Sequence, residues 1–281
     1  MGKWVFLNNE FVQEEKAALH FRDLSIQRGY GIFDFFKVVN GIPVFLSAHV
    51  NRFYFSAAQM RLRVRYSMEE LQTIIQQLLQ KNDMPHTGVR ITLTGGYSAD
   101  GYQLSEPNLL ISAHPFTPPS KEQMEKGISL ITHLHQRQLP QVKTIDYLMA
   151  IWLQPLIKEK KADDVLYYQN TVISECPRSN LFMVTKENKI ITPAKNILKG
   201  IVRMKVMDLA KKWFEVEERD ISIDEIKTAK EVFITSTTKS ILPVARINEH
   251  SFDKSFTIAA QLLSSLKELE ASDCSIKDRI P

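Results

Sequence analysis

The chain has 281 residues, of which 44% are hydrophobic and 24% charged, and its formal net charge is +4. This length and hydrophobic content suit one large globular domain or two medium ones. Lysines and arginines are interspersed with acidic residues, which argues against nucleic acid as the main partner.

No apolar run approaches the roughly 18 residues that a membrane span needs, and no signal peptide is apparent, so we expect a cytoplasmic protein. The two cysteines, Cys176 and Cys274, are too few for a disulfide framework or a cysteine zinc site. The histidines lack a third ligand at metal-like spacing, and we therefore expect no metal site.

The first part of the chain predicts strands, then two helices, then strands. Asn40-Gly41 separates two apolar runs and favours the tight turn of a hairpin. Ser67 and Glu70 form the capping box of a helix. The expected elements are strands within 3–12, a hairpin within 35–46, helices at 48–60 and 67–82, and strands at 88–94 and 108–114. They define a small first domain, 1–115.

Three prolines in the stretch HPFTPPSKEQ disfavour both helix and sheet, and they predict a linker at 116–123. The second domain, 124–281, mixes predominantly antiparallel strands with helices and lacks the regular alternation of a doubly wound sheet. Its expected elements are strands at 127–134, 164–175, 181–192, 231–236 and 242–247 and helices after 144 and at 199–213, 222–229 and 256–270. The fold class is therefore predicted to be α+β.

The stretch QVKTIDYLMAIW, residues 141–152, predicts an amphipathic helix after Thr144. Leu148 and Ile151 are expected on its buried face. Lys143 precedes this helix, and a lone lysine at such a junction is usually a solvated surface charge.

Lys143 gains significance from the residues that accompany it. Glu175, a helix that begins at Gly200 and the hydroxyl-rich stretch TSTTKS follow it in the same domain, and Arg52 lies in the other. Pyridoxal phosphate (PLP) chemistry needs these parts: a lysine for the Schiff base, an acid for the pyridine nitrogen and an anion cradle for the phosphate. The backbone N–H groups at a helix start supply part of such a cradle.

As a set, these motifs resemble the class IV, fold type IV PLP enzymes, which include D-amino acid transaminases, branched-chain aminotransferases and aminodeoxychorismate lyases. The matching stretches are RGYGIFDFFKVVNGIPVFLSAHVNRFYFSA, VKTIDYL, VISECPRSNLFMV, ITPAKNILKGIVR and EVFITSTTKSILPV. The resemblance implies a small N-terminal α/β sandwich and a larger, β-barrel-like C-terminal domain that binds PLP. It also implies a homodimer with the active site near the interface.

The resemblance further implies a role for each matched residue. Lys143 forms the Schiff base and moves protons, Glu175 pairs with the pyridine nitrogen, and Arg52 binds the phosphate. The other implied cofactor residues are Leu198 under the ring and Gly200, Ile201, Val202, Ser236 and Thr237 around the phosphate.

The chain departs from the family pattern in two places near the cofactor. Val202 stands where the family often has threonine, so one hydroxyl is missing from the phosphate site. Cys176-Pro177-Arg178 replaces the small residues that commonly follow the glutamate, which stiffens this loop and adds a charge.

Arg28 and Arg90 are expected to bind a substrate carboxylate, because a guanidinium group matches a carboxylate with two parallel hydrogen bonds. The alternative is that Arg28 is a turn residue and Arg90 pairs with a surface acid. Arg178 and Thr238 are also assigned to the substrate.

Two glycines bear on the choice of family branch. Gly95 stands where D-amino acid transaminases often have the arginine that binds the α-carboxylate, and Arg28 and Arg90 are expected to replace it. Gly88 stands where branched-chain enzymes usually have a tyrosine, which weakens that assignment.

The predicted function is transfer of the amino group of a D-amino acid to a 2-oxo acid, 2-oxoglutarate or pyruvate, in two half-reactions. The alternatives are a branched-chain L-amino acid aminotransferase, an aminodeoxychorismate lyase and an inactive binding module of the same fold. The pair of Lys143 and Glu175 argues against the last, because a binding module has no need of a Schiff-base lysine.

Overall fold

The computed structural model describes residues 3–277, which form two compact units. The first unit contains the chain up to Phe116, the segment Val142–Asp146 and the chain from Asp273, and the second contains Thr117–Gln141 and Tyr147–Ser272. The segment with Lys143 thus groups with the first unit, and not with an uninterrupted domain 124–281. A short helix, α4 (Lys121–Lys126), occupies part of the segment expected to be a linker.

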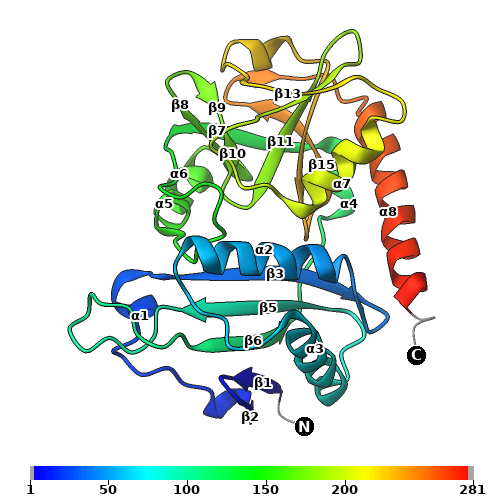
Figure 1. Cartoon of the computed structure of the whole chain (residues 1–281). Helices are drawn as coiled ribbons and strands as arrows, with labels where there is room; N and C mark the ends of the chain where they lie inside the picture. Colours follow the sequence, from blue (N-terminus) through cyan, green and yellow to red (C-terminus); the bar gives the residue numbers. More distant parts are fainter. Residues whose placement is uncertain (1–2, 278–281) are drawn as a thin grey trace. The chain divides into compact units, whose positions relative to one another are not determined.

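The first unit is an antiparallel sheet with two helices packed against one face (Figure 1). Its strand order is β2-β1-β6-β5-β3-β4. The elements are β1 (Trp4–Leu7), β2 (Glu10–Gln13), η1 (Glu14–Lys16), α1 (Leu24–Arg28), β3 (Gly31–Val39), β4 (Ile42–Pro43), α2 (Leu46–Gln59), α3 (Met68–Asn82), β5 (Thr87–Thr94) and β6 (Leu109–His114). The strands and helices expected in this part of the chain are therefore confirmed.

Local sequence signals account for the turns and helix starts of this unit. Asn40 and Gly41 adopt positive φ angles of 53° and 78°, as the tight turn between β3 and β4 requires. The side chain of Ser67 accepts a hydrogen bond from the Glu70 N–H, and the Glu70 carboxylate accepts one from the Ser67 N–H. The predicted capping box is therefore present at the start of α3.

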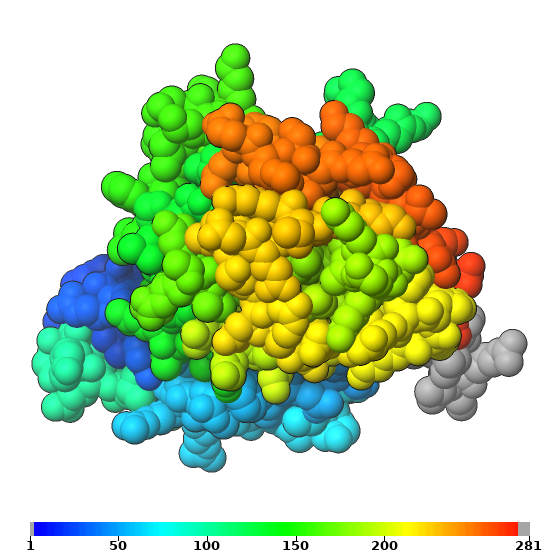
Figure 2. Space-filling view, turned by 90° about the horizontal axis from the view of Figure 1, so that it is seen from above, coloured from blue at the N-terminus to red at the C-terminus, as the bar shows by residue number. Residues whose placement is uncertain are grey.

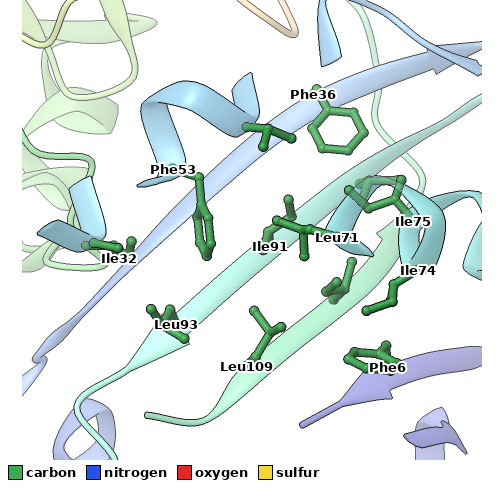
Figure 3. Packing of buried hydrophobic residues seen from close by; sticks show 14 of the residues in the cluster. Phe6, Ile32, Phe36, Phe53, Leu71, Ile74, Ile75, Ile91, Leu93 and Leu109 are labelled. Atoms are coloured by element: carbon green, nitrogen blue, oxygen red, sulfur yellow. The ribbon is translucent and has the colours of Figure 1, made fainter. Parts of the chain in front are cut away.

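The core of the first unit lies between the sheet and its helices (Figure 3). Alternate residues of β3, such as Ile32 and Phe36, are completely buried and belong to the same cluster as Phe53 of α2. Ile75 of α3 is buried against the same sheet face. The intervening residues of β3, such as Phe33, occupy the opposite face, where Arg90 and Lys143 lie against the Phe33 ring.

The second unit is built on one mixed sheet that curls into a half-barrel. Most strand pairs are antiparallel, but β7–β8, β7–β15 and β12–β13 are parallel. Beyond α4, its elements are β7 (Ile128–Leu134), α5 (Leu148–Trp152), α6 (Gln154–Glu159), β8 (Asp164–Gln169), β9 (Val172–Ile173), β10 (Glu175–Cys176), β11 (Ser179–Val184), β12 (Ile190–Thr192), α7 (Ile201–Ala210), β13 (Val216–Glu218), η2 (Glu225–Thr228), β14 (Glu231–Ser236), β15 (Ser240–Ile247), β16 (His250–Ser251) and α8 (Thr257–Lys277). Figure 2 shows the yellow and orange segments, which include α7 and β15, gathered on one face. The predicted α+β fold of two units is confirmed.

The segment that follows Lys143 differs from the expectation. The helix α5 begins only at Leu148, and the residues around Lys143 are extended. The expected burial of Leu148 and Ile151 is wrong, because their side chains are 75% and 68% exposed. Met149, which is partly buried, and Leu153, which directly follows the helix, pack instead in a small core cluster.

Candidate active site

Lys143 lies in an extended segment that adds to the edge of the first unit's sheet beside β3. The Phe33 N–H donates to the Lys143 carbonyl at 2.9 Å, and the Ile145 N–H donates to the Gly31 carbonyl at 3.1 Å. The Lys143 N–H donates to Ser56 Oγ of α2 at 3.3 Å. The backbone of Lys143 is thus fixed by a strand and by a helix of the same unit.

Arg90 on β5 and Lys143 share one aromatic neighbour, Phe33 on β3. Arg90 Cζ lies 4.1 Å from the centre of the Phe33 ring, and Lys143 Nζ lies 4.6 Å from it. Arg90 Nε also donates to Thr92 Oγ1 at 3.3 Å. Phe33 pairs across the strands with Thr92, so these side chains share the sheet face opposite the helices. The fold therefore places a guanidinium group and the amine of Lys143 against the same aromatic ring.

Arg52 on α2 is held by a buried acid on β3. Asp34 accepts hydrogen bonds from Arg52 Nε and Nη2, both at 2.8 Å, and from His49 Nδ1 at 2.7 Å. Asp34 and His49 are almost completely buried, and the Arg52 side chain is 10% exposed. Burial alone would raise the pKa of Asp34, but Arg52 and His49 outweigh it and hold that pKa well below its usual range. The ionised carboxylate therefore fixes the orientation of the guanidinium.

Glu175 is the central acid of the second unit, and three groups hold it. Arg137 donates to Glu175 Oε1 from Nε at 2.9 Å and from Nη2 at 2.8 Å. The Leu198 N–H donates to Oε2 at 2.9 Å, and Asn180 Nδ2 lies 3.4 Å from the same oxygen. Glu175 is only 4% exposed, so the arginine compensates a carboxylate that is largely removed from water.

The helix α7 begins next to this acid. Asn180 Nδ2 donates to the Leu198 carbonyl at 2.8 Å and so ties the loop before α7 to the strand after Glu175. A side-chain carbon added at Gly200 would lie 2.2 Å from Asn180 Oδ1, so a larger residue there would displace the Asn180 side chain. No side chain of the described chain caps the helix at Gly200. The backbone N–H groups of Ile201 and Val202, the first two helical residues, therefore suit an anion.

The turn between β14 and β15 carries the hydroxyl cluster. Ser236, Thr237 and Thr238 are all half-buried. Ser236 Oγ accepts a hydrogen bond from the Lys239 N–H at 3.1 Å. The Lys239 side chain reaches Asp164 on β8, with Nζ 2.8 Å from Oδ2.

Arg28 and Arg178 lie at exposed positions. Arg28 is the last residue of α1, its Nη1 donates to the Gln27 carbonyl at 3.0 Å, and its Nη2 lies near Gly101. The structure thus places Arg28 in contact with residues other than the group around Phe33. Arg178 lies in the tight turn between β10 and β11.

Other potentially reactive groups have structural explanations. Cys176 is completely buried, and burial raises the pKa of its thiol well above the usual value, so a nucleophilic thiolate is disfavoured. Within residues 3–277, no cluster of three or more histidine, cysteine or acidic side chains could hold a metal ion. No helix in the described part of the chain combines the length and apolar character needed to cross a membrane.

Three residues of this site escaped prediction from the sequence. Arg137, Asn180 and Asp34 each contact a predicted residue, but none of them was assigned a role from the sequence. Arg137 lies 38 residues before Glu175, in a loop without a regular pattern. The one available signal was the isolated acid in the apolar strand around Asp34, because a buried acid usually requires a cationic partner.

The fold and the site together define a PLP-dependent transferase, and comparison with known proteins supports this class. The family model of class IV aminotransferases matches residues 31–247. The chain belongs to this family. Among curated proteins, a D-alanine aminotransferase from Bacillus licheniformis is 30% identical over 251 residues, which cover 87% of this chain and 88% of the relative.

Solved structures share the fold at lower sequence identity. A branched-chain amino acid aminotransferase from Escherichia coli has a TM-score of 0.90 at 22% identity and covers 97% of this chain and 96% of its own. A chain from Legionella pneumophila, provisionally named a 4-amino-4-deoxychorismate lyase, has a TM-score of 0.84 at 24% identity, with coverages of 92% and 97%. At these identities the likeness establishes the fold alone.

The cofactor of class IV aminotransferases is PLP, and a solved structure with this fold contains pyridoxamine 5′-phosphate. The residues present fit this group. Glu175 offers a buried carboxylate that is paired with Arg137 and can accept a hydrogen bond from a protonated pyridine nitrogen. The uncapped start of α7, where the Asn180 side chain occupies the space beside Gly200, offers backbone donors to a phosphate.

Proposed function

We propose that this aminotransferase moves the amino group of a D-amino acid to a 2-oxo acid such as 2-oxoglutarate or pyruvate. The observation that carries the proposal is the position of Arg90 and Lys143 over one aromatic ring. In an α-amino acid, the carboxylate is attached to the same carbon as the amino group. A guanidinium group that lies against the same ring as the lysine amine therefore suits this substrate class. The relatives named D-alanine aminotransferases favour the D series.

We propose the following roles for the residues predicted from the sequence. Glu175 would hold the pyridine nitrogen, Leu198 would pack under the ring, and Lys143 would form the covalent link. The phosphate would be held by Arg52, Gly200, Ile201, Val202, Ser236 and Thr237. Arg90 is the primary carboxylate-binding residue, and Arg28, Arg178 and Thr238 are assigned to the substrate as well.

PLP, when bound, supplies a conjugated ring that withdraws electrons from the amino acid. Lys143 Nζ removes the proton from the substrate Cα and holds it for return, so one amine serves as base and then as acid. Arg90 fixes the carboxylate and thereby the direction in which the Cα–H bond points. Arg137 keeps Glu175 in place as an anion.

The structure offers one argument against a branched-chain assignment. Gly88 takes the place of the tyrosine that is usual in that branch. A side-chain carbon at this position would lie 2.0 Å from Cζ of Phe35, so the Phe35 ring already occupies the space. A larger residue at 88 would require Phe35 to move.

We also propose that the chain forms a homodimer. Several large apolar side chains are exposed, and groups of this kind mark protein interfaces. In the second unit they include Leu134, Leu139, Leu148, Ile151 and Trp152. Trp152 also contacts the ring of His133, with centroids 6.2 Å apart, which links α5 to the end of β7 in one surface.

The test of the proposed activity is incubation of the PLP form with a panel of D- and L-amino acids, followed by the spectral conversion to pyridoxamine phosphate. D-Alanine and D-glutamate should convert the cofactor, whereas L-leucine should not. Conversion by L-amino acids alone would overturn the proposal. Pyruvate release from aminodeoxychorismate without an oxo acid would favour the lyase. The Lys143→Ala variant serves as control and should lose both turnover and the visible absorbance of the bound cofactor.

A further inference from the structure

Lys239 closes the hydroxyl-bearing turn between β14 and β15 and anchors it at two points. Its backbone N–H donates to Ser236 Oγ at 3.1 Å, across the turn. Its ammonium group lies 2.8 Å from Asp164 Oδ2 on β8 and 3.4 Å from Ser179 Oγ on β11. The turn is thus tied to two strands that are distant in sequence.

The ion pair of Lys239 and Asp164 is unusual for a residue in a hairpin turn. Lysine in a turn usually extends into water, but here the Lys239 side chain is 18% exposed and that of Asp164 only 9%. Both charges are largely removed from solvent, so neither can leave the other without exposing an unpaired charge to a poorly polar environment. The pair is therefore a rigid connection, unlike the solvent-exposed ion pairs on this unit.

The hydrogen bond from the Lys239 N–H leaves the Ser236 hydroxyl free to act as a donor. Ser236 Oγ already accepts the Lys239 N–H, so its own hydrogen remains for donation to another group. A donor is what a phosphate oxygen requires. The contact to Ser179 matters as well, because Ser179 directly precedes Asn180, which binds the loop leading to α7. Lys239 therefore links the hydroxyl turn to the hairpin that carries Glu175.

We propose that Lys239 is a positioning residue, which, through its pair with Asp164, holds the Ser236–Thr238 turn with its hydroxyl donors directed at the cofactor phosphate. The inference rests on the proposed phosphate site at Ser236 and Thr237. Lys239 itself does not bind the cofactor in this proposal. Its removal should weaken recognition of the phosphate while leaving recognition of the ring intact.

The experiment compares PLP with pyridoxal, which lacks the phosphate, in titrations of the apoprotein in phosphate-free buffer. Lys239→Met keeps the length and apolar stem of the side chain but removes the charge. We expect it to weaken PLP about tenfold, or about 1.4 kcal/mol, and to change pyridoxal affinity less than about twofold. Asp164→Asn removes the partner's charge and should reproduce this selective loss. Lys239→Arg retains the cation and should recover most of the PLP affinity.

The matched control is Lys227→Met, which breaks an ion pair of the same 2.8 Å length with Asp224 at an exposed site of the same unit. It should leave both affinities unchanged. Equal weakening of PLP and pyridoxal in Lys239→Met and Asp164→Asn would show a merely structural role and overturn the inference, as would unchanged PLP affinity. If circular dichroism shows that either Lys239→Met or Asp164→Asn does not fold, the affinities of the other variant decide the test.

Failure of this inference is distinguishable from failure of the proposed function. Ser236→Ala, measured beside the other variants, tests the phosphate site directly. If this variant keeps the wild-type ratio of PLP affinity to pyridoxal affinity, both the phosphate site and the inference are contradicted. If Ser236→Ala loses the preference for PLP over pyridoxal but Lys239→Met keeps it, only the role of Lys239 is contradicted. Neither titration involves an amino acid, so the stereochemical test of the activity is independent of both.

Discussion

Replacing Asp34 by asparagine is the sharpest perturbation of the first unit's charged network. The substitution keeps the shape of the side chain but removes its charge and turns one acceptor oxygen into an amide donor. Asp34 accepts three hydrogen bonds from His49 and Arg52, so an amide cannot satisfy all of them. The guanidinium group of Arg52 would then lie next to an N–H group at a site from which water is largely excluded.

The expected cost follows from the burial of the pair. Asp34 is completely buried and the Arg52 side chain is 10% exposed. Breaking a buried ion pair by removing one partner costs about 3–5 kcal/mol, and the residual exposure of Arg52 places the expectation near about 3 kcal/mol. An exposed pair of the same unit provides the contrast: Arg65 and Glu106 are 49% and 50% exposed, so Glu106→Gln should cost far less than Asp34→Asn.

Urea denaturation of the apoproteins measures this difference, with Glu106→Gln as the control. The pH dependence gives a second signature. The pKa of Asp34 is lowered in the folded state, so its stabilising effect is complete above the unfolded value of about 3.9 and is lost as the pH falls toward the folded value. The difference between wild type and Asp34→Asn should therefore shrink below about pH 4.

Two results would refute this reasoning. The first is a cost for Asp34→Asn no greater than that for Glu106→Gln. The second is a stability difference between wild type and Asp34→Asn that stays constant on acidification. A double variant with Arg52→Met adds a further check, since residues that share an ion pair should cost less together than the sum of the two single changes.

Two further predictions concern packing and assembly. Gly88→Ala places a carbon 2.0 Å from Phe35 Cζ, so overpacking should destabilise the protein by about 1–3 kcal/mol in thermal unfolding. Phe35→Leu in the same chain should restore part of the loss. An unaffected melting temperature would contradict this prediction and show that the Phe35 ring moves freely. Sedimentation should give about twice the mass of one chain for the wild type, and replacement of Ile151 and Trp152 by glutamate should reduce it, whereas a wild-type monomer would contradict the proposed dimer.

Local chemistry made much of the fold predictable. Asn40-Gly41 defines a turn by its backbone preference, and Ser67 with Glu70 defines a helix start, so both could be predicted without tertiary information. The buried face of α5 could not be predicted in this way. Five residues allow more than one apolar stripe, and the cluster around Ile157 and Val165 selects Met149 and Leu153 over the residues predicted to be buried. When a short helix carries apolar residues on all sides, tertiary packing decides which of them become buried.

The candidate site was predictable to the extent that its residues lie in recognisable motifs. Lys143, Glu175 and the start of α7 were proposed in this way, although the helix expected after Thr144 begins only at Leu148 and Lys143 itself lies at an extended strand edge. Arg137 illustrates the limit. Its importance arises only from its contact with Glu175, and no local pattern encodes a contact between residues 38 positions apart.

Three of the charged residues proposed to bind or position the cofactor share a feature: each has a partner of opposite charge within its own unit. Arg52 is held by Asp34, Glu175 by Arg137, and Lys239 by Asp164. These contacts immobilise the side chains when the chain folds, so their conformational entropy is already lost before any ligand binds. They also neutralise charges that burial would otherwise disfavour. Preorganisation of this kind gives residues that were not assigned from the sequence, such as Asp34 and Arg137, a part in holding the proposed site.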